Sequence, residues 1–171
     1  MDPSRLVGVI GSRECDAGTY DLAYQVGRML AEKGFGVVCG GLGGVMEAVC
    51  KGAVEAGGLT IGILPGELPE SANSFVKIRV ATGMGIARNV IIVRSSAAVI
   101  AIAGGPGTLS EVAYCLQLGV PVVSLKSFDV SPSIIQVTTP AAAVAEAVRI
   151  ARTTRAKPAK PAKPAPDGDD R

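Results

Sequence analysis

Short apolar runs closed by glycine recur along this chain, and most are followed by segments with helical spacing of apolar residues. The runs at residues 6–11 and 98–103 show no polar alternation, which is typical of strands buried on both faces of a sheet. Parallel strands need a crossover connection, and a helix commonly supplies it. The pattern therefore predicts an α/β, Rossmann-like, doubly wound fold: a mainly parallel sheet of about six or seven strands with helices on both faces.

The expected elements alternate over most of the chain. In sheets of this type ligands bind beyond the carboxyl ends of the strands, so functional residues are expected there. Strands are expected at residues 6–11, 37–39, 59–64, 76–80, 98–103, 122–125 and 134–137. Helices are expected at residues 19–33, 44–55, 86–94, 108–118 and 139–153, and a loop at residues 65–74.

Charge and composition limit the partners. Residues 156–171 repeat Ala-Lys-Pro without an apolar face, so we expect a disordered tail after a single domain at residues 1–155. Without that tail the formal net charge falls from +2 to +1. A nucleic-acid-binding surface normally needs clustered Lys and Arg, so this balance argues against nucleic acid as a partner.

Signals of secretion and membrane insertion are not found. The longest apolar run, residues 97–103, is far shorter than the roughly 20 residues that a membrane helix needs. The cysteines show no paired CxxC spacing. We therefore expect a cytoplasmic protein without membrane partners, in which Cys15, Cys39, Cys50 and Cys115 are reduced, buried thiols.

The sequence contains no histidine. Ser-His-Asp triads, Cys-His pairs and His-ligated metal sites are thereby excluded. Any general acid or base must be Asp, Glu, Lys, Tyr or Cys, and we expect no metal site.

The stretch AIAGGPGTLSE ends a strand with glycines and opens a helix. Gly104, Gly105 and Gly107 have no side chains to keep an anion from the backbone, and the free N–H groups of a helix N-terminus attract one. Thr108 can donate its hydroxyl to the same anion, so the pattern predicts a phosphate-sized site. A capping box, in which Thr108 and Glu111 bond to helix-end N–H groups, explains these two residues without a ligand. Both interpretations remain open.

A second stretch of the same form, VVCGGLGGVMEAV, starts at Val37. Its Glu47 lies in the first helical turn, as Glu111 does in the other stretch, although favourable charge at a helix N-terminus is the simpler explanation of Glu47. Two such turns at one edge of a sheet are expected to line a single cleft. The glycines of this turn are Gly40, Gly41, Gly43 and Gly44.

Other phosphate-binding motifs are not matched. No Lys-Ser or Lys-Thr pair follows the glycines, as a Walker loop requires. The segment GSRECDAG after the first strand lacks the G-x-G-x-x-G fingerprint of dinucleotide-binding proteins. ATPase and NAD-dependent functions are therefore disfavoured.

These motifs resemble those of the LOG-like family, long mislabelled lysine decarboxylases. The family includes cytokinin-activating nucleoside-monophosphate phosphoribohydrolases and molybdenum-cofactor carrier proteins. GGPGTLSE from Gly104 is similar to the family's PGGxGTxxE motif, and GGLGGVMEA from Gly40 is similar to its second glycine motif. GIARN, residues 85–89, resembles the family's Arg-containing helix. The resemblance extends over about residues 7–125.

The resemblance implies a nucleoside 5′-monophosphate ligand and a catalytic pair. It implies that Glu111 orients the ribose or activates water, and that Arg88 is the second catalytic residue. A carboxylate near the cleaved N-glycosidic bond stabilises the cationic sugar. Without the resemblance, Arg88 would be interpreted as a surface or phosphate-facing cation on the exposed side of its helix. The phosphate- or nucleotide-binding residues expected are Gly11, Ser12, Gly40, Gly41, Gly43, Gly44, Met46, Gly104, Gly105, Gly107 and Thr108.

Several positions depart from the hydrolase pattern. Ala103 replaces the proline that begins PGGxGT, and Pro106 occupies its variable position. Ala97 stands where the hydrolases usually carry Asp, and Asn89 stands where a basic residue commonly follows the Arg. These departures make the chain more similar to the short, carrier-like branch.

Distant kinship to single-strand DNA-binding recombination proteins is the least favoured function, because such binding needs a basic, stacking surface and this chain has few aromatic residues and a nearly balanced charge. Two other functions remain open. One is a phosphoribohydrolase that releases the base of a nucleoside monophosphate. The other is a non-catalytic carrier of a phosphate-bearing cofactor such as molybdenum cofactor. Neither requires a further cofactor. Because family members usually form homodimers, the resemblance also implies a homodimer or higher homo-oligomer, formed through apolar helix faces at residues 85–95 and 108–118.

Overall fold

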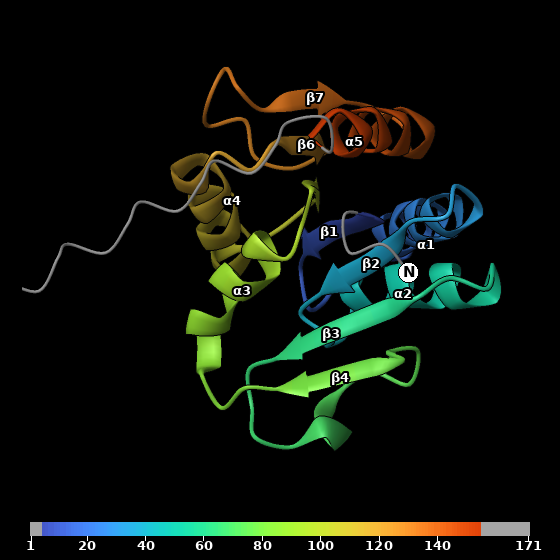
Figure 1. The fold of residues 1–171 in the computed structure, drawn as a ribbon, viewed down its shortest axis with the longest axis vertical. Coiled ribbons are helices and arrows are strands. Elements are labelled where there is room, and N and C mark those ends of the chain that lie inside the picture. Colours follow the sequence, from blue (N-terminus) through green and yellow to red (C-terminus); the bar gives the residue numbers. More distant parts are fainter. Residues whose placement is uncertain (1–4, 155–171) are drawn as a thin grey trace, which may run out of the picture.

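The computed structural model of the chain describes residues 5–154 (Figure 1). Its centre is a seven-stranded sheet in the order β4-β3-β2-β1-β5-β6-β7, in which all neighbouring strands are parallel. The predicted α/β, Rossmann-like fold is confirmed, whereas the tail expected at residues 156–171 lies outside the described residues. The strands are β1 (Leu6–Gly11), β2 (Gly36–Cys39), β3 (Thr60–Leu64), β4 (Ile78–Ala81), β5 (Ala98–Ile102), β6 (Val122–Leu125) and β7 (Ile135–Val137).

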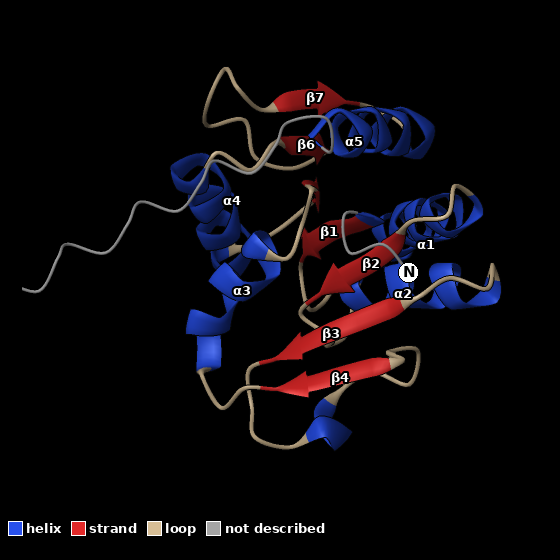
Figure 2. Cartoon of the chain, viewed as in Figure 1, coloured by secondary structure: helices blue, strands red, loops and turns tan. Residues whose placement is uncertain are grey.

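Helices cover both faces of the sheet (Figure 2). One face carries three of them: α1 (Ala17–Glu32), α2 (Val45–Glu55) and α5 (Pro140–Thr154). The other face carries α3 (Asn89–Arg94) and α4 (Pro106–Leu118). Two 3₁₀ helices, η2 (Pro69–Ser71) and η3 (Gly85–Arg88), lie in the connections before and after β4.

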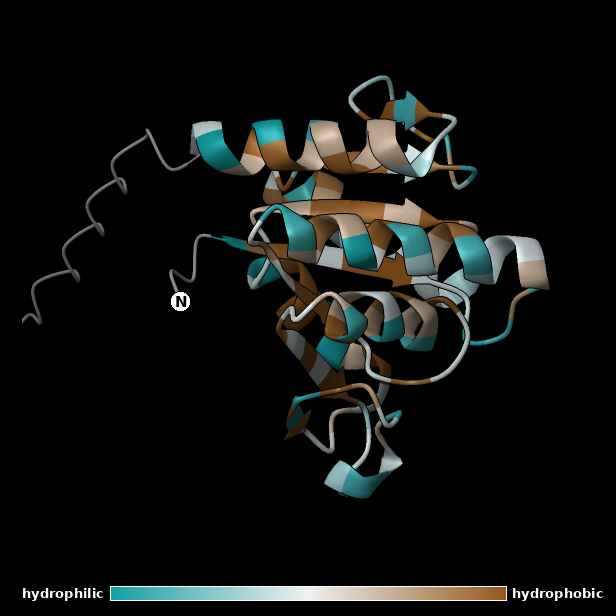
Figure 3. Ribbon diagram, turned by 90° about the vertical axis from the view of Figure 1, so that its right-hand side faces the viewer, coloured by the Kyte–Doolittle hydropathy of each residue, from teal (hydrophilic) through white to brown (hydrophobic). Residues whose placement is uncertain are grey.

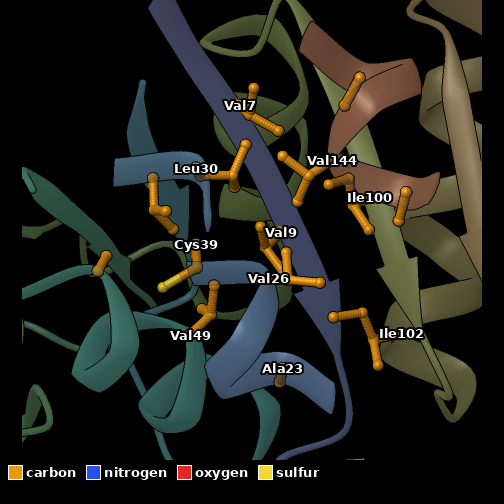
Figure 4. Close-up of a cluster of buried hydrophobic side chains, with 14 of the residues drawn as sticks. Val7, Val9, Ala23, Val26, Leu30, Cys39, Val49, Ile100, Ile102 and Val144 are labelled. Carbon is orange, nitrogen blue, oxygen red and sulfur yellow. The ribbon is translucent and has the colours of Figure 1, made fainter. Parts of the chain in front are cut away.

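The core is aliphatic and forms one layer on each face of the sheet. On one face Val9 of β1 packs in the same cluster as Val26 of α1 and Val144 of α5 (Figure 4). On the other face Ile10 of β1 packs in the same cluster as Val112 of α4. Figure 3 shows the strands as mostly apolar between helices that carry hydrophilic residues. Because both faces are covered, the strands need no polar alternation, which is the property that the apolar runs predicted.

The strand order reverses next to β1. From β1 the chain adds β2, β3 and β4 on one side, and then returns to place β5 on the other side of β1. Gly11 at the end of β1 is in register with Ile102 at the end of β5, so both strands finish at the same level. The following helices, α1 and α4, lie on opposite faces of the sheet. A crevice opens at such a switch point, and ligands of doubly wound sheets bind there.

Most helices and strands begin and end within two residues of the predicted positions, and two differences affect the site. Helix α4 begins at Pro106 and not at Thr108, because the fixed φ of proline suits the first helical position. The segment expected as one helix at residues 86–94 is η3 followed by α3.

Three sequence-based expectations can be compared with the described residues. Within residues 5–154 no helix has both the length and the hydropathy to cross a membrane. The same residues contain no group of acidic or cysteine side chains arranged to hold a metal ion. All four cysteines are free thiols. Cys39, Cys50 and Cys115 are buried as expected, whereas Cys15 is only half-buried.

Candidate functional site

A cavity of about 550 Å³ lies at the switch point, beyond the carboxyl ends of β1 and β2. Its wall comes from the β1–α1 loop, the end of β2, η3 and the first turn of α4. A cavity of this volume can hold a small organic ligand. Most of the predicted site residues line it: Gly11, Ser12, Gly40, Met46, Arg88, Gly105, Gly107, Thr108 and Glu111.

The turn between β5 and α4 brings helix-end N–H groups to this cavity. Gly105 caps α4 with a φ of −129°, and no side chain bonds to the helix end. The capping-box interpretation of Thr108 and Glu111 is therefore wrong, because both lie inside a helix that starts at Pro106. A Cβ atom at Gly105 or Gly107 would have no neighbour within 4 Å. The first helical turn thus faces open space with its backbone uncovered.

The turn between β2 and α2 uses its glycines differently. Gly40 lines the cavity, whereas Gly41, Gly43 and Gly44 do not. A Cβ at Gly41 would lie 2.7 Å from Leu64 Cδ2, and one at Gly44 would lie 2.5 Å from the carbonyl oxygen of Ser12. Both glycines also have positive φ angles, 72° and 61°. Neighbouring segments leave no room for a side chain at Gly41 or Gly44, so the fold accounts for both glycines without a ligand.

Gly104, the fourth predicted ligand residue outside the cavity wall, is also required by the fold. Its φ is 134°, and a Cβ atom there would lie 2.8 Å from the Thr108 side chain. Glu47 likewise does not line the cavity and accepts a hydrogen bond of 3.3 Å from the Tyr20 hydroxyl. Its place in the first turn of α2 agrees with the expected favourable charge at a helix N-terminus.

Arg88 and Glu111 form a buried pair on the floor of the cavity. Arg88 is 7% exposed and Glu111 is 6% exposed, so the interpretation of Arg88 as a surface cation is wrong. Arg88 Nη1 lies 3.7 Å from Glu111 Oε1. Burial raises the pKa of Glu111 to about 7, although the charge of Arg88 opposes the rise. Burial lowers the pKa of Arg88, against the opposing effect of Glu111.

Asn89 connects this pair to the first turn of α4. Its Oδ1 accepts a hydrogen bond from Arg88 Nη1. Its Nδ2 donates to Ser110 Oγ at 2.8 Å and to the Gly107 carbonyl oxygen at 3.5 Å. The Ser110 hydroxyl donates in turn to the Gly107 oxygen at 2.7 Å. Because Asn89 is buried, its amide has a fixed orientation between a cation and two oxygen acceptors.

Several lining residues were not predicted. Arg13 and Glu14 follow β1 directly, so their position at the end of a strand was a signal that could have identified them. Leu42, Pro65 and Ile86 form an apolar part of the wall, and no sequence pattern separates them from ordinary loop residues. The cavity therefore combines an uncovered helix end, an apolar wall and a charge set of two cations and two carboxylates.

Comparisons with known proteins cover the whole described fold. A model of the SLOG cluster4 family matches residues 4–155. An uncharacterized protein from Archaeoglobus fulgidus is 52% identical over 138 residues, which are 81% of this chain and 91% of that protein. The molybdenum cofactor binding protein from the phototrophic bacterium Rippkaea orientalis has a TM-score of 0.79 and 36% identity, over 84% of this chain and 94% of that chain. The molybdenum cofactor carrier protein from Chlamydomonas reinhardtii has a TM-score of 0.78 and 33% identity, over 85% and 96% of the two chains.

Proposed function

The chain belongs to the SLOG cluster4 family, and we propose that it is a carrier that binds molybdenum cofactor through its phosphate group. The predicted resemblance to the carrier-like branch of the LOG-like family is confirmed. The observation that supports the proposal most is the open space beside Gly105 and Gly107 at the start of α4. The phosphate of the ligand would occupy that space.

Backbone geometry alone does not require glycine at these two positions. The φ of −129° at Gly105 is open to any residue, and Gly107 lies in a regular helix. Gly105 is the N-cap of α4, a position that glycine suits. Glycine inside a helix costs about 1 kcal/mol relative to alanine, so the fold gains nothing from Gly107. An anion that must approach the backbone N–H groups gives a physical reason for Gly107, and it would use the open space beside Gly105 as well.

The remaining cavity suits the flat ring system of a pterin or a purine. Leu42, Met46, Pro65 and Ile86 line the cavity with apolar side chains. A cavity of about 550 Å³ is within the range that encloses a small organic ligand. The similarity to solved molybdenum-cofactor carrier and binding proteins favours the pterin as cargo.

Stoichiometric binding without turnover tests the proposal. The purified protein is mixed with molybdenum cofactor released from a molybdoenzyme, and retained pterin is measured by fluorescence after gel filtration and oxidation. We expect about one pterin per chain, and we expect Gly107→Ala to lose most of it. Gly18→Ala is the matched control, because Gly18 is also the second residue of its helix but does not line the cavity. Equal retention by both variants, or none by the wild type, would contradict the proposal.

Hydrolysis of a nucleoside 5′-monophosphate is a second candidate, favoured by the buried Arg88–Glu111 pair. An ionised Glu111 would stabilise the positive charge that develops on the sugar as the N-glycosidic bond breaks. A carboxyl group with a pKa of about 7 can also exchange a proton with water near neutral pH. The products would be a free base and ribose 5-phosphate.

Release of free base from a panel of nucleoside monophosphates, measured by chromatography, tests this candidate. We expect any release to be lost in Glu111→Gln, because the neutral amide cannot stabilise the cationic sugar. Glu47→Gln is the control, because Glu47 lies in the first turn of α2 and does not line the cavity. Binding of the nucleotide with no base released by the wild type would leave the carrier function alone.

We further propose that a second copy of the chain covers α4, giving a homodimer. Its outward side chains include Leu109, Tyr114, Leu116 and Leu118, which are between 37% and 40% exposed. The buried Glu111 is the sole charged residue of this helix, whereas a helix facing water normally carries a polar face. Sedimentation velocity tests the proposal: we expect a dimer, and a monomer after Leu116→Lys. A monomeric wild type at micromolar concentration would contradict it.

A further inference from the structure

We infer that Asn89 is a positioning residue, which holds the Arg88 guanidinium back from Glu111 and so keeps this buried cation available to the anionic group of a ligand. The ligand part of this role rests on the proposed function. The positioning itself depends only on contacts within the chain.

The separation of Arg88 and Glu111 is the first observation. Their nearest nitrogen and oxygen atoms are 3.7 Å apart, whereas charged hydrogen bonds between guanidinium and carboxylate groups are about 2.7 to 2.9 Å long. Arg88 Nε is buried and has no hydrogen-bond partner among residues 5–154. A buried cation that stops short of its carboxylate and leaves a donor unused must be held by something else.

Asn89 provides one restraint. Its Oδ1 accepts from Arg88 Nη1, the same nitrogen that lies nearest to Glu111. The amide cannot follow Arg88 toward Glu111, because its Nδ2 is held by Ser110 Oγ and the Gly107 oxygen. These two acceptors lie at the start of α4, next to the open space proposed to hold the phosphate. The position of Arg88 therefore depends on the same part of α4 as the proposed phosphate site.

Gly40 provides the restraint on the other side. A Cβ atom at Gly40 would collide with Arg88 Nη2, so the guanidinium lies directly against this glycine. The group is thus held between the end of β2 and Asn89. If Oδ1 of Asn89 is removed, Nη1 loses its acceptor and is free to form a direct hydrogen bond with Glu111.

Closure of this pair would be visible in the titration of Glu111. Arg88 of η3 is the ionisable group that acts on the pKa of Glu111, whereas the charge of Glu111 acts to raise the pKa values of the Cys39 thiol of β2 and the Cys115 thiol of α4. Arg13 and Glu14 of the β1–α1 loop line the same cavity. Within the described part of the chain, Arg88 is the member of this set that bonds to Asn89. A change at Asn89 therefore reaches Glu111 through Arg88.

Nuclear magnetic resonance of the Glu111 carboxyl carbon in the ligand-free protein tests the positioning, with Glu111→Gln to assign the signal. Asn89→Leu should lower the titration midpoint by about one to three pH units, because a closed pair favours the ionised carboxylate. Asn89→Asp should leave the midpoint at or above the wild-type value, because it keeps an oxygen acceptor for Arg88 and adds a negative charge. A merely structural role for Asn89 would not lower the midpoint in Asn89→Leu and leave it undiminished in Asn89→Asp.

An unchanged or raised midpoint in folded Asn89→Leu would overturn the positioning role. If that variant does not fold, Ser110→Ala decides, because it removes one anchor of the Asn89 amide and should lower the midpoint by a smaller amount. Calorimetry with sulfate at pH 6 tests the ligand part, and we expect at least about tenfold weaker binding in Asn89→Leu. Equal sulfate affinity in the wild type and Asn89→Leu would overturn it. If the wild type binds no sulfate, the proposed function fails, while the carboxyl titration still decides the positioning.

Discussion

In the turn between β2 and α2, Gly44 has a φ of 61° and lies against the backbone of the β1–α1 loop. In the turn between β5 and α4, Gly107 lies in a helical turn with empty space beside its Cα. Both turns lead from a parallel strand to a helix at the same edge of the sheet. The glycines of the first turn let segments of the fold approach each other. In the second turn Gly104 is likewise required by the fold, whereas Gly105 and Gly107 leave room that the fold itself does not use.

The carboxylates of the two helices differ in the same way. Glu47 of α2 bonds to the Tyr20 hydroxyl away from the cavity, whereas Glu111 of α4 is buried opposite Arg88 on the cavity floor. Similar sequence patterns at one sheet edge can thus have different physical causes. We infer that a residue of these turns binds ligand where contacts within the fold do not explain why that residue type is present. Substitution of each residue tests this inference.

The largest effect is expected at Gly44. Gly44→Ala would place a Cβ atom 2.5 Å from the Ser12 oxygen in a left-handed conformation, so we expect a loss of about 2 to 5 kcal/mol of unfolding free energy. Urea denaturation measures it. Gly57→Ala is the control, because Gly57 has a φ of 75° but no neighbour within 4 Å, and should lose only about 1 to 2 kcal/mol. If both variants lose the same amount, close approach to the β1–α1 loop is not what Gly44 provides.

The fold was predictable from sequence because its signal is repeated. Each buried strand is an apolar run and each surface helix has a 3.6-residue period, so an error at one boundary does not alter the architecture. Two boundaries were predicted incorrectly, for local reasons. Pro106 could belong to the turn or to the first helical position, and the sequence does not distinguish these. The segment at residues 86–94 is a 3₁₀ turn followed by a short helix, and its periodicity is too brief to separate the two.

The site was predictable only in part. The glycine turns indicated the correct edge of the sheet, but the sequence could not tell Gly107, beside a cavity, from Gly44, beside a backbone. The burial of Arg88 depends on Gly40, which is distant in the chain, and on the neighbouring Asn89. The amide of Asn89 is in turn held by Ser110 and Gly107 of α4, and these residues meet only in the folded structure. Tertiary contacts of this kind leave no periodic pattern. Resemblance to a family pointed to Arg88 and Glu111 as candidate site residues, whereas the contacts around them are visible only in the structure.

An intermediate effect is expected on the affinity for sulfate, which should depend on the ionisation of Glu111 but not on Glu47. Sulfate is a suitable probe because its own charge does not change near neutral pH. Below pH 7 Glu111 is mainly protonated and Arg88 is unopposed. Above pH 7 the carboxylate repels the anion and competes for Arg88. We expect sulfate affinity to fall about tenfold between pH 6 and pH 8, by calorimetry. Glu111→Gln should remove this dependence, and Glu47→Gln should keep it. A pH-independent wild type would show that the anion does not reach the pair.

The smallest expected effect is a gain of stability at Gly107, opposite in sign to the loss expected at Gly44. It therefore separates the two kinds of glycine most clearly. Gly107→Ala should raise the unfolding free energy by about 0.4 to 1 kcal/mol, since alanine restricts the unfolded chain and meets no neighbour in the folded one. Gly18→Ala, at the second position of α1, should give a similar gain. Urea denaturation of both variants without ligand measures these gains. A loss of stability in Gly107→Ala alone would mean that the fold needs this glycine, as it needs Gly44. A gain accompanied by lost pterin binding would mean that stability has been given up at this turn to leave room for a ligand.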